Sequence, residues 1–224
     1  MGSPGRALAP GTYGLEGGRG ELVIRATVNG WLTFRVSTVS LHGNVCDLPG
    51  NIPPGSTTSV IEDEHDNPRC VVELEPTARG VSVDITAGRD ACLQSCGAGG
   101  TVSGEFELIP AACGGELRSA ADAAFKEAYQ RKAFAEARAI LEPQLRDCGK
   151  FLWEADQADL RNDLAVTMHH LGQDAECLAT LEPLRKLTTL SDVEIEESST
   201  LYQAGHFKQI AKAARYNLRL CGKK

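Results

Sequence analysis

Residues 20–36 read GELVIRATVNGWLTFRV, and this stretch decides the fold of the first half of the chain. Apolar side chains stand at alternate positions, with Leu22 and Ile24 before the Asn29-Gly30 pair and Phe34 after it. Alternation of this kind is typical of a β-strand that buries one face. Because Asn-Gly is typical of a type I′ turn, the stretch predicts an antiparallel hairpin.

The same alternation recurs over residues 70–75, 81–86 and 102–108, and turn residues such as Arg79-Gly80 separate the runs. The connections are too short for helices, so neighbouring strands are expected to pair antiparallel. Residues 13–113 are therefore predicted to form an antiparallel β meander with one dry face, closed as a small barrel or as a sandwich.

Composition changes near residue 114, and this change divides the chain into two predicted domains. Eighteen of the 23 glycines lie in residues 1–114, and every lysine lies at Lys126 or beyond. We expect an antiparallel β domain over residues 13–113 and a helical domain over residues 114–224. Residues 1–12 are expected to be a loose tail. They contain no apolar signal-peptide core, so a signal peptide is expected to be absent from this chain.

The second half contains an internal repeat at an offset of 40 residues. Residues 137–143 read ARAILEP, and residues 177–183 read CLATLEP. A third unit matches the first at an offset of 73 residues, with Cys148 falling on Cys221. Each unit predicts a helix, a tight turn and a second helix. The turns are expected at Arg131-Lys132, Leu171-Gly172 and Ala204-Gly205.

These units resemble degenerate tetratricopeptide-type repeats. Phe134, Ala137 and Leu141 stand where that pattern has its aromatic, small and large apolar residues. Pro143 and Pro183 come earlier than the family's terminal proline and are expected to kink or end the second helix. The fold class is therefore α+β in two domains, with an irregular helical bundle as the alternative for the second.

The resemblance implies a concave face, lined by the first helix of each unit, that binds a peptide or a partner protein. An ordinary solvated helix face is the alternative. The repeat positions place these side chains in the groove: Lys126, Tyr129, Gln130, Asn162, Val166, His169 and His170.

The chain contains eight cysteines, a high number for a reduced protein. They show no C-x-x-C pair and no paired Cys/His spacing, so zinc is disfavoured and no metal ligand is assigned. Spread cysteines in even number indicate disulfides and an oxidising compartment. The absence of an N-x-S/T sequon favours a bacterial periplasm over a eukaryotic secretory route. The disulfide candidates are Cys46, Cys70, Cys92, Cys96, Cys113, Cys148, Cys177 and Cys221.

The predicted boundary leaves five cysteines in the β domain and three in the helical domain. If all eight pair, at least one bridge must join the domains and fix their relative orientation. Cys113 lies at the boundary and is the expected member, with Cys148 as its partner. Two free buried thiols are the alternative.

Negative charge is concentrated in the first part of the chain. The net charge is −7, and residues 1–114 contain seven arginines against thirteen acidic residues. Such a domain repels nucleic acid and attracts basic proteins. The most acidic run is expected to form a loop that contacts a basic partner, with a solvated turn or a calcium site as alternatives. This loop consists of Glu62, Asp63, Glu64, His65 and Asp66.

No catalytic motif and no apolar run long enough for a membrane span is present in the sequence. We therefore expect no enzymatic activity, no cofactor and no membrane span. The acidic β domain resembles, weakly, the small periplasmic barrels that inhibit lysozymes. The resemblance is carried by the run from Cys92 to Gly97 that leads into a strand at Val102, and it transfers no inhibitory residue.

The expected function is that of a non-enzymatic periplasmic or secreted protein-binding protein. Its most concrete form is an inhibitor or immunity protein that occludes a basic cell-wall hydrolase or a secreted toxin. An envelope scaffold that grips a peptide through its helical repeats is the alternative. An enzyme of unrecognised type is a third possibility, which a pocket joining a perturbed carboxylate to a histidine would favour.

Overall fold

The computed structural model describes residues 7–40, 43–61, 69–94, 96–97, 100–199 and 201–223. The chain divides into two compact units, residues 1–109 and 110–224, and each has its own hydrophobic core.

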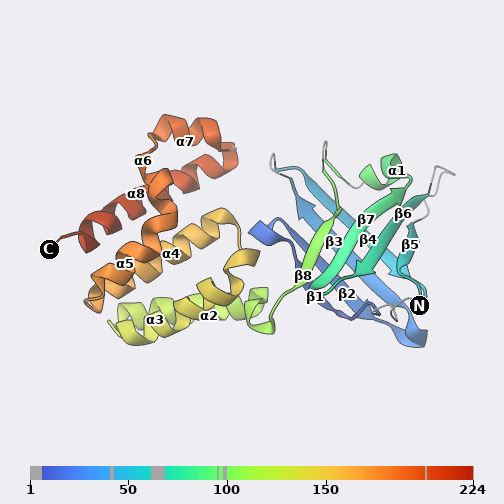
Figure 1. The fold of residues 1–224 in the computed structure, drawn as a ribbon, viewed down its shortest axis with the longest axis horizontal. Helices are drawn as coiled ribbons and strands as arrows, with labels where there is room; N and C mark the ends of the chain where they lie inside the picture. Colours follow the sequence, from blue (N-terminus) through green and yellow to red (C-terminus); the bar gives the residue numbers. More distant parts are fainter. Residues whose placement is uncertain are drawn as a thin grey trace. The chain divides into compact units, whose positions relative to one another are not determined.

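The first unit is a nearly closed β-barrel of antiparallel strands (Figure 1). Strands that follow one another along the chain pair with each other, except β4 and β5, and β1 also pairs with β8. The sheet is therefore open between β4 and β5. This order is that of an up-and-down barrel, which excludes the sandwich. The strands are β1 (Gly11–Gly14), β2 (Gly20–Ala26), β3 (Leu32–Val39), β4 (Val45–Ile52), β5 (Thr58–Ile61), β6 (Cys70–Pro76), β7 (Gly80–Ala87) and β8 (Gly104–Leu108).

The predicted β2–β3 hairpin is confirmed. Ile24 lies opposite Phe34 in the register, and both side chains are buried in the barrel. Asn29 and Gly30 have φ angles of 63° and 76°, the left-handed conformation that a type I′ turn requires. The apolar members of the alternating pattern therefore fill the barrel interior.

Strand β4 was not predicted from the sequence, because Pro49 and Gly50 interrupt its pattern. Pro49 is tolerated because β4 lies at one end of the sheet, where one row of backbone donors has no strand to pair with. Gly50 lies opposite Phe34, and a Cβ atom there would collide with the Phe34 ring. The missing side chain makes room for an aromatic core residue.

One short helix, α1 (Arg89–Leu93), departs from the expectation that the connections contain no helix. The Cys70–Cys92 disulfide joins it to β6, and the Cys46–Cys96 disulfide joins the following segment to β4. A buried cysteine and a covalent link stabilise a helix too short to persist alone.

The second unit is helical, and its first four helices form two hairpins, α2–α3 and α4–α5 (Figure 1). Lys132 and Gly172 adopt φ angles of 60° and 73° in the two turns, so the turns predicted at these positions are confirmed. The helices are α2 (Gly115–Gln130), α3 (Phe134–Pro143), α4 (Glu154–His170), α5 (Asp174–Leu181), α6 (Arg185–Thr189), α7 (Asp192–Ser198) and α8 (Leu201–Cys221).

The prolines end their helices as predicted. Pro143 is the last residue of α3, and a π-helical turn, Gln144–Cys148, follows it. Helix α5 ends at Leu181, and Pro183 lies in the 3-10 turn that comes next.

The third predicted hairpin is not formed. Helix α8 runs without a break through Ala204 and Gly205, where we expected a tight turn. Its buried residues Ile210, Ala211 and Ala214 form an apolar stripe against the rest of the unit. Burial along this stripe outweighs the roughly 1 kcal/mol by which one glycine disfavours a helix.

All eight cysteines are paired, so the alternative of two free buried thiols is wrong. The Cys113–Cys148 pairing is confirmed, but the expectation that this bridge joins two domains is wrong. Both residues belong to the helical unit, because the chain divides at residue 109 rather than 113. The fourth bridge, Cys177–Cys221, also lies in that unit, so each unit holds two disulfides and none links them.

The four disulfides fit a protein of an oxidising compartment, periplasmic or extracellular. Among the helices in the described residues, none has the length and apolar character needed to cross a bilayer.

Candidate functional site

An acidic groove lies between α2 and α4, the first helices of the two hairpins. Its volume is about 410 Å³, and Leu141 and Gln144 at the end of α3 contribute to its wall. The charged side chains that line this acidic groove are Arg118, Asp122, Asp156, Asp159 and Asp163.

The spacing of the aspartates on α4 explains why they face the same way. Asp156, Asp159 and Asp163 stand at positions i, i+3 and i+7, which share one face of a helix. Other faces of α4 carry buried residues such as Ala158 and Ala165, so they pack into the core. The polar stripe therefore lies on the remaining side, where Arg118 of α2 and His206 of α8 reach it.

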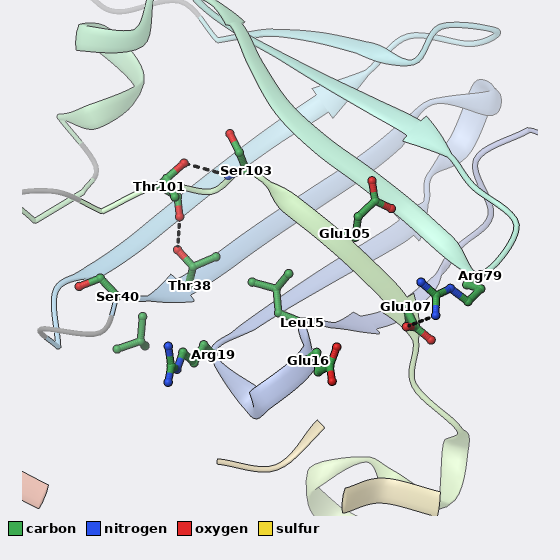
Figure 2. Close-up of a pocket in the computed structure, with 11 residues that line it drawn as sticks. Leu15, Glu16, Arg19, Thr38, Ser40, Arg79, Thr101, Ser103, Glu105 and Glu107 are labelled. Atoms are coloured by element: carbon green, nitrogen blue, oxygen red, sulfur yellow. Dashed lines mark hydrogen bonds and ion pairs between the residues drawn. The ribbon is translucent and has the colours of Figure 1, made fainter. Parts of the chain in front are cut away.

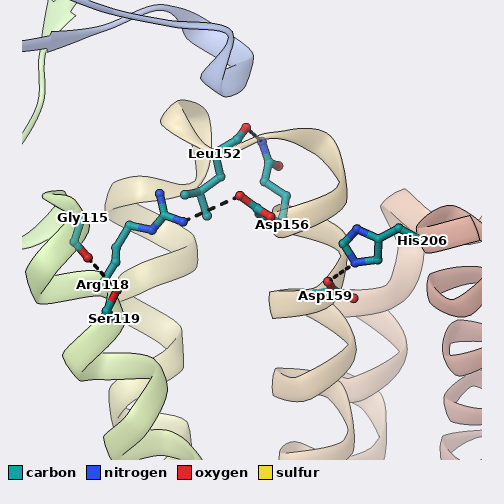
Figure 3. A network of polar contacts seen from close by, with 8 residues as sticks. Gly115, Arg118, Ser119, Leu152, Asp156, Asp159 and His206 are labelled. Carbon is teal, nitrogen blue, oxygen red and sulfur yellow. Dashed lines mark hydrogen bonds and ion pairs between the residues drawn. The ribbon is translucent and has the colours of Figure 1, made fainter. Parts of the chain in front are cut away.

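Two of the four aspartates have a cationic neighbour, and a third contacts a histidine. Arg118 Nη2 lies 3.7 Å from Asp156 Oδ2, and Lys126 Nζ lies 2.6 Å from Asp122 Oδ2. His206, from α8, has its Nε2 atom 2.6 Å from Asp159 Oδ2 (Figure 3). These six side chains are between 41% and 64% exposed, so the pairs stay open to solvent and contribute little to stability.

Asp163 is the exception among the four. Within the described part of the chain, its carboxylate makes no hydrogen bond and no ion pair. Burial raises the pKa of Asp163 to about 6, and the negative charges of Asp159 and Asp122 act in the same direction. Lys126 opposes them but does not offset the burial. The groove thus holds a carboxylate whose negative charge is poorly compensated.

The predicted groove residues on α2 lie at and beyond one end of the acidic groove. Lys126 pairs with Asp122, and Gln130 is exposed at the last position of α2. Tyr129 is half-buried, with its ring 5.4 Å from that of Phe134 and 5.7 Å from that of Phe125.

The predicted residues on α4 are spread over several environments. Asn162 is buried, and its amide donates to the Ile210 carbonyl on α8. Val166 is half-buried. His170 is exposed and stacks on Phe134 with ring centroids 4.3 Å apart, whereas His169 contacts Asp174. The structure therefore brings together Tyr129, His169 and His170, with ring centroids 5.9 Å apart for Tyr129–His170 and 5.8 Å apart for His169–His170. It does not bring all the predicted side chains into one surface, because Asn162 is buried.

The sequence analysis did not select the four aspartates, because, apart from Asn162, it placed the groove one to two turns further along each helix. The i, i+3, i+7 spacing on α4 was the signal that marks an acidic helix face. The part played by Asp122 had no local signal, since it depends on α2 and α4 lining the same groove.

The acidic run from Glu62 to Asp66, predicted to contact a partner, lies outside the described residues.

A second concave area, of about 360 Å³, lies on the barrel unit (Figure 2). Thr38 donates a hydrogen bond of 2.5 Å to the Thr101 carbonyl there, and Arg79 lies 3.3 Å from Glu107. Its charged residues are of both signs, so it selects a partner's charge less strongly than the acidic groove. They are Glu16, Arg19, Arg79, Glu105 and Glu107.

One group of metal-ligating side chains occurs among the described residues. The ligand atoms of His169, Asp174 and Cys221 lie within 4.8 Å of one another. Cys221 is joined to Cys177 in a disulfide, so it offers no thiolate in this state.

Comparison of the chain with protein-family models, with curated protein sequences and with solved structures gives no match in any of the three. The function is therefore inferred from the side chains and their geometry.

Proposed function

We propose that this chain is a non-enzymatic protein-binding protein that docks a basic partner in the acidic groove between α2 and α4. The observation that carries the proposal is the carboxylate of Asp163. It is largely buried, flanked by Asp159 and Asp122, and raised in pKa to about 6.

A cationic side chain that enters the groove would compensate the negative charge of Asp163. An ammonium or guanidinium group beside Asp163 would form a charge-assisted hydrogen bond in a partly desolvated place, where such bonds are strongest. The volume of about 410 Å³ admits a few side chains, not a folded element. The expected contact is therefore a protruding basic segment on the surface of the partner.

An oxidising compartment such as the periplasm limits which basic proteins the chain could meet. Four disulfides and a net charge of −7 support an acidic periplasmic protein, whose basic partners would include cell-wall hydrolases and secreted toxins. We propose that the chain acts as an inhibitor or immunity protein that occludes such an enzyme.

The test measures binding and inhibition with a panel of purified basic peptidoglycan hydrolases, and with acidic hydrolases as the negative set. Asp156→Asn with Asp159→Asn should lower the association rate about tenfold at low salt and flatten its dependence on ionic strength. Asp163→Asn should act mainly on dissociation, because its charge is buried.

The matched control is Asp147→Asn, which removes one carboxylate of the same unit outside the groove, where Asp147 pairs with Arg146 at 2.8 Å. It should leave both rates within about twofold. Equal effects of control and groove variants, or inhibition of no basic hydrolase, would overturn the proposal.

The run from Glu62 to Asp66 is proposed as a second contact. Neutralising Glu62, Asp63, Glu64 and Asp66 together should slow association and reduce its salt dependence. An unchanged association rate would remove this loop from the interface.

An envelope scaffold that binds a peptide through the same groove is the alternative. Co-purification separates the two functions, because an inhibitor brings down one small basic enzyme and abolishes its activity. A scaffold brings down membrane machinery without inhibiting an enzyme.

One observation favours an enzyme as a further candidate, since the groove brings Asp163 together with the Asp159–His206 pair. A carboxyl group with a pKa of about 6 exchanges protons near neutral pH. Turnover of peptidoglycan by the chain alone, abolished by Asp163→Asn, would establish this candidate and contradict the binding function.

A further inference from the structure

The turn between α4 and α5 brings a histidine and an aspartate together. Gly172, with a φ angle of 73°, reverses the chain so that the last turn of α4 meets the first turn of α5. His169 Nδ1 and Asp174 Oδ1 lie 2.6 Å apart as a result. Both side chains are partly exposed, at 28% and 42%, so the pair is accessible from solvent.

Two sulfur atoms lie beside this pair. Cys177 follows Asp174 by one helical turn on α5 and is buried. Its disulfide partner, Cys221, is the last residue of α8. The ligand atoms of Cys221, His169 and Asp174 are all within 4.8 Å of one another, and the Cys177 sulfur is bonded to that of Cys221.

These four residues are the ligand types that zinc prefers. Zinc takes a tetrahedral set of thiolate, imidazole and carboxylate ligands at about 2.0–2.3 Å, which places the ligand atoms roughly 3.3–3.8 Å apart. The ligand atoms of His169, Asp174 and Cys221 lie within 4.8 Å of one another, and the Cys177 sulfur is bonded to that of Cys221, so the four side chains start close to such an arrangement. The bond between the two sulfurs must break, and the 2.6 Å contact between His169 Nδ1 and Asp174 Oδ1 must open, before the set can close around an ion.

We infer that reduction of the Cys177–Cys221 disulfide creates a zinc site formed by His169, Asp174, Cys177 and Cys221. The inference is independent of the acidic groove and of the function proposed for it. In the oxidised state a covalent bond ties α5 to the end of α8, and in the reduced state the metal ion makes the same tie.

The chemistry balances with a dithiol as the reductant. The dithiol supplies two electrons and two protons, the bond between the two sulfurs breaks, and the reductant leaves as its own disulfide. Zn²⁺ then displaces one proton from each of the two thiols. Asp174 binds as a carboxylate and His169 as a neutral imidazole, so metal affinity should fall as the pH is lowered.

The experiment uses the full chain, reduced with a phosphine that offers no competing thiols, and Co²⁺ as a spectroscopic probe. One Co²⁺ per chain should bind, with thiolate-to-cobalt charge-transfer bands and the visible bands of a tetrahedral ion. Zn²⁺ should displace it and raise the melting temperature of the reduced chain by about 5 °C or more. The oxidised chain should show neither effect.

The variants separate this site from the other reduced cysteines. Cys177→Ser with Cys221→Ser should abolish the charge-transfer bands, and Asp174→Asn or His169→Ala should weaken the affinity about tenfold or more. Two control variants should leave the charge-transfer bands and the metal affinity unchanged. They are Cys113→Ser with Cys148→Ser, which removes a pair of thiols elsewhere, and His170→Ala, which removes the adjacent histidine.

Three results would overturn the inference. The first is Co²⁺ binding that survives Cys177→Ser with Cys221→Ser. The second is binding that is insensitive to both His169→Ala and Asp174→Asn. The third is a reduced chain that lacks helical circular dichroism and does not regain it when Zn²⁺ is added.

Discussion

At the scale of single residues, Asp163 shows how burial acts on charge. Its pKa is about 6 in the folded chain, against an ordinary value of 3.8. The folded state therefore binds more protons than the unfolded state between these values. The free energy of unfolding falls as the pH rises from about 4 to about 6, and the loss persists at neutral pH.

Asp163→Asn removes this penalty, because the amide carries no charge to desolvate. We expect the free energy of unfolding at pH 7.5 to rise by about 1–3 kcal/mol, and to change little at pH 4. Denaturant titrations at the two pH values measure the difference. An equal rise in the free energy of unfolding at pH 7.5 and at pH 4 would show that the effect comes from packing and not from charge.

Asp147→Asn is the control for this prediction. The Arg146 guanidinium hydrogen-bonds Asp147 and lowers the pKa of its carboxyl below the ordinary value. Loss of this carboxylate should not stabilise the chain at pH 7.5.

At the scale of elements, glycine has opposite effects on stability in α8 and in the α4–α5 turn, because the backbone is helical in one and has a positive φ angle in the other. Gly205 lies inside α8 and Gly172 lies in the turn with a φ angle of 73°, and a Cβ atom at either would meet nothing within 4 Å. The two positions therefore differ in backbone conformation and not in available space.

Gly205→Ala should raise the free energy of unfolding by about 0.5–1 kcal/mol, because alanine favours the helix. Gly172→Ala should lower it by about 1 kcal/mol, because alanine is strained at positive φ. Thermal or denaturant unfolding of the two variants measures the sign of each change in the free energy of unfolding. A destabilising Gly205→Ala would contradict a continuous α8.

At the scale of the whole molecule, each unit has its own core and two disulfides of its own. The chain has two tryptophans, Trp31 in the barrel and Trp153 in the helical unit, so each unit has its own fluorescent reporter. Variants that keep one tryptophan and replace the other by phenylalanine follow the units separately.

Removing the Cys113–Cys148 bridge should destabilise the helical unit alone. A loop closed over a sequence separation of 35 contributes about 3–4 kcal/mol by restricting the unfolded chain. Cys113→Ser with Cys148→Ser should therefore lower the unfolding midpoint reported by Trp153 and leave that of Trp31 in place. A shift of the Trp31 midpoint would show that the two units unfold together.

Local periodicity in the sequence determined much of this protein. Alternation over residues 20–36 predicted the β2–β3 hairpin, the repeat of residues 137–143 predicted the helical hairpins, and the cysteine content indicated an oxidising compartment. The first two signals depend on spacing within single elements, and the third depends on composition alone. Steric fit of the backbone and burial of one face act at that range, so sequence pattern alone reveals them.

Only the tertiary structure decided the features that depend on distant partners. Pairing of β1 with β8 closes the barrel, and packing against Phe34 makes a strand of the segment around Gly50. Burial along α8 overrides the glycine at position 205, and the approach of α2 to α4 places Asp122 beside Asp163. These outcomes follow from contacts between segments far apart in the chain, whose free energy exceeds the local preference of any single residue.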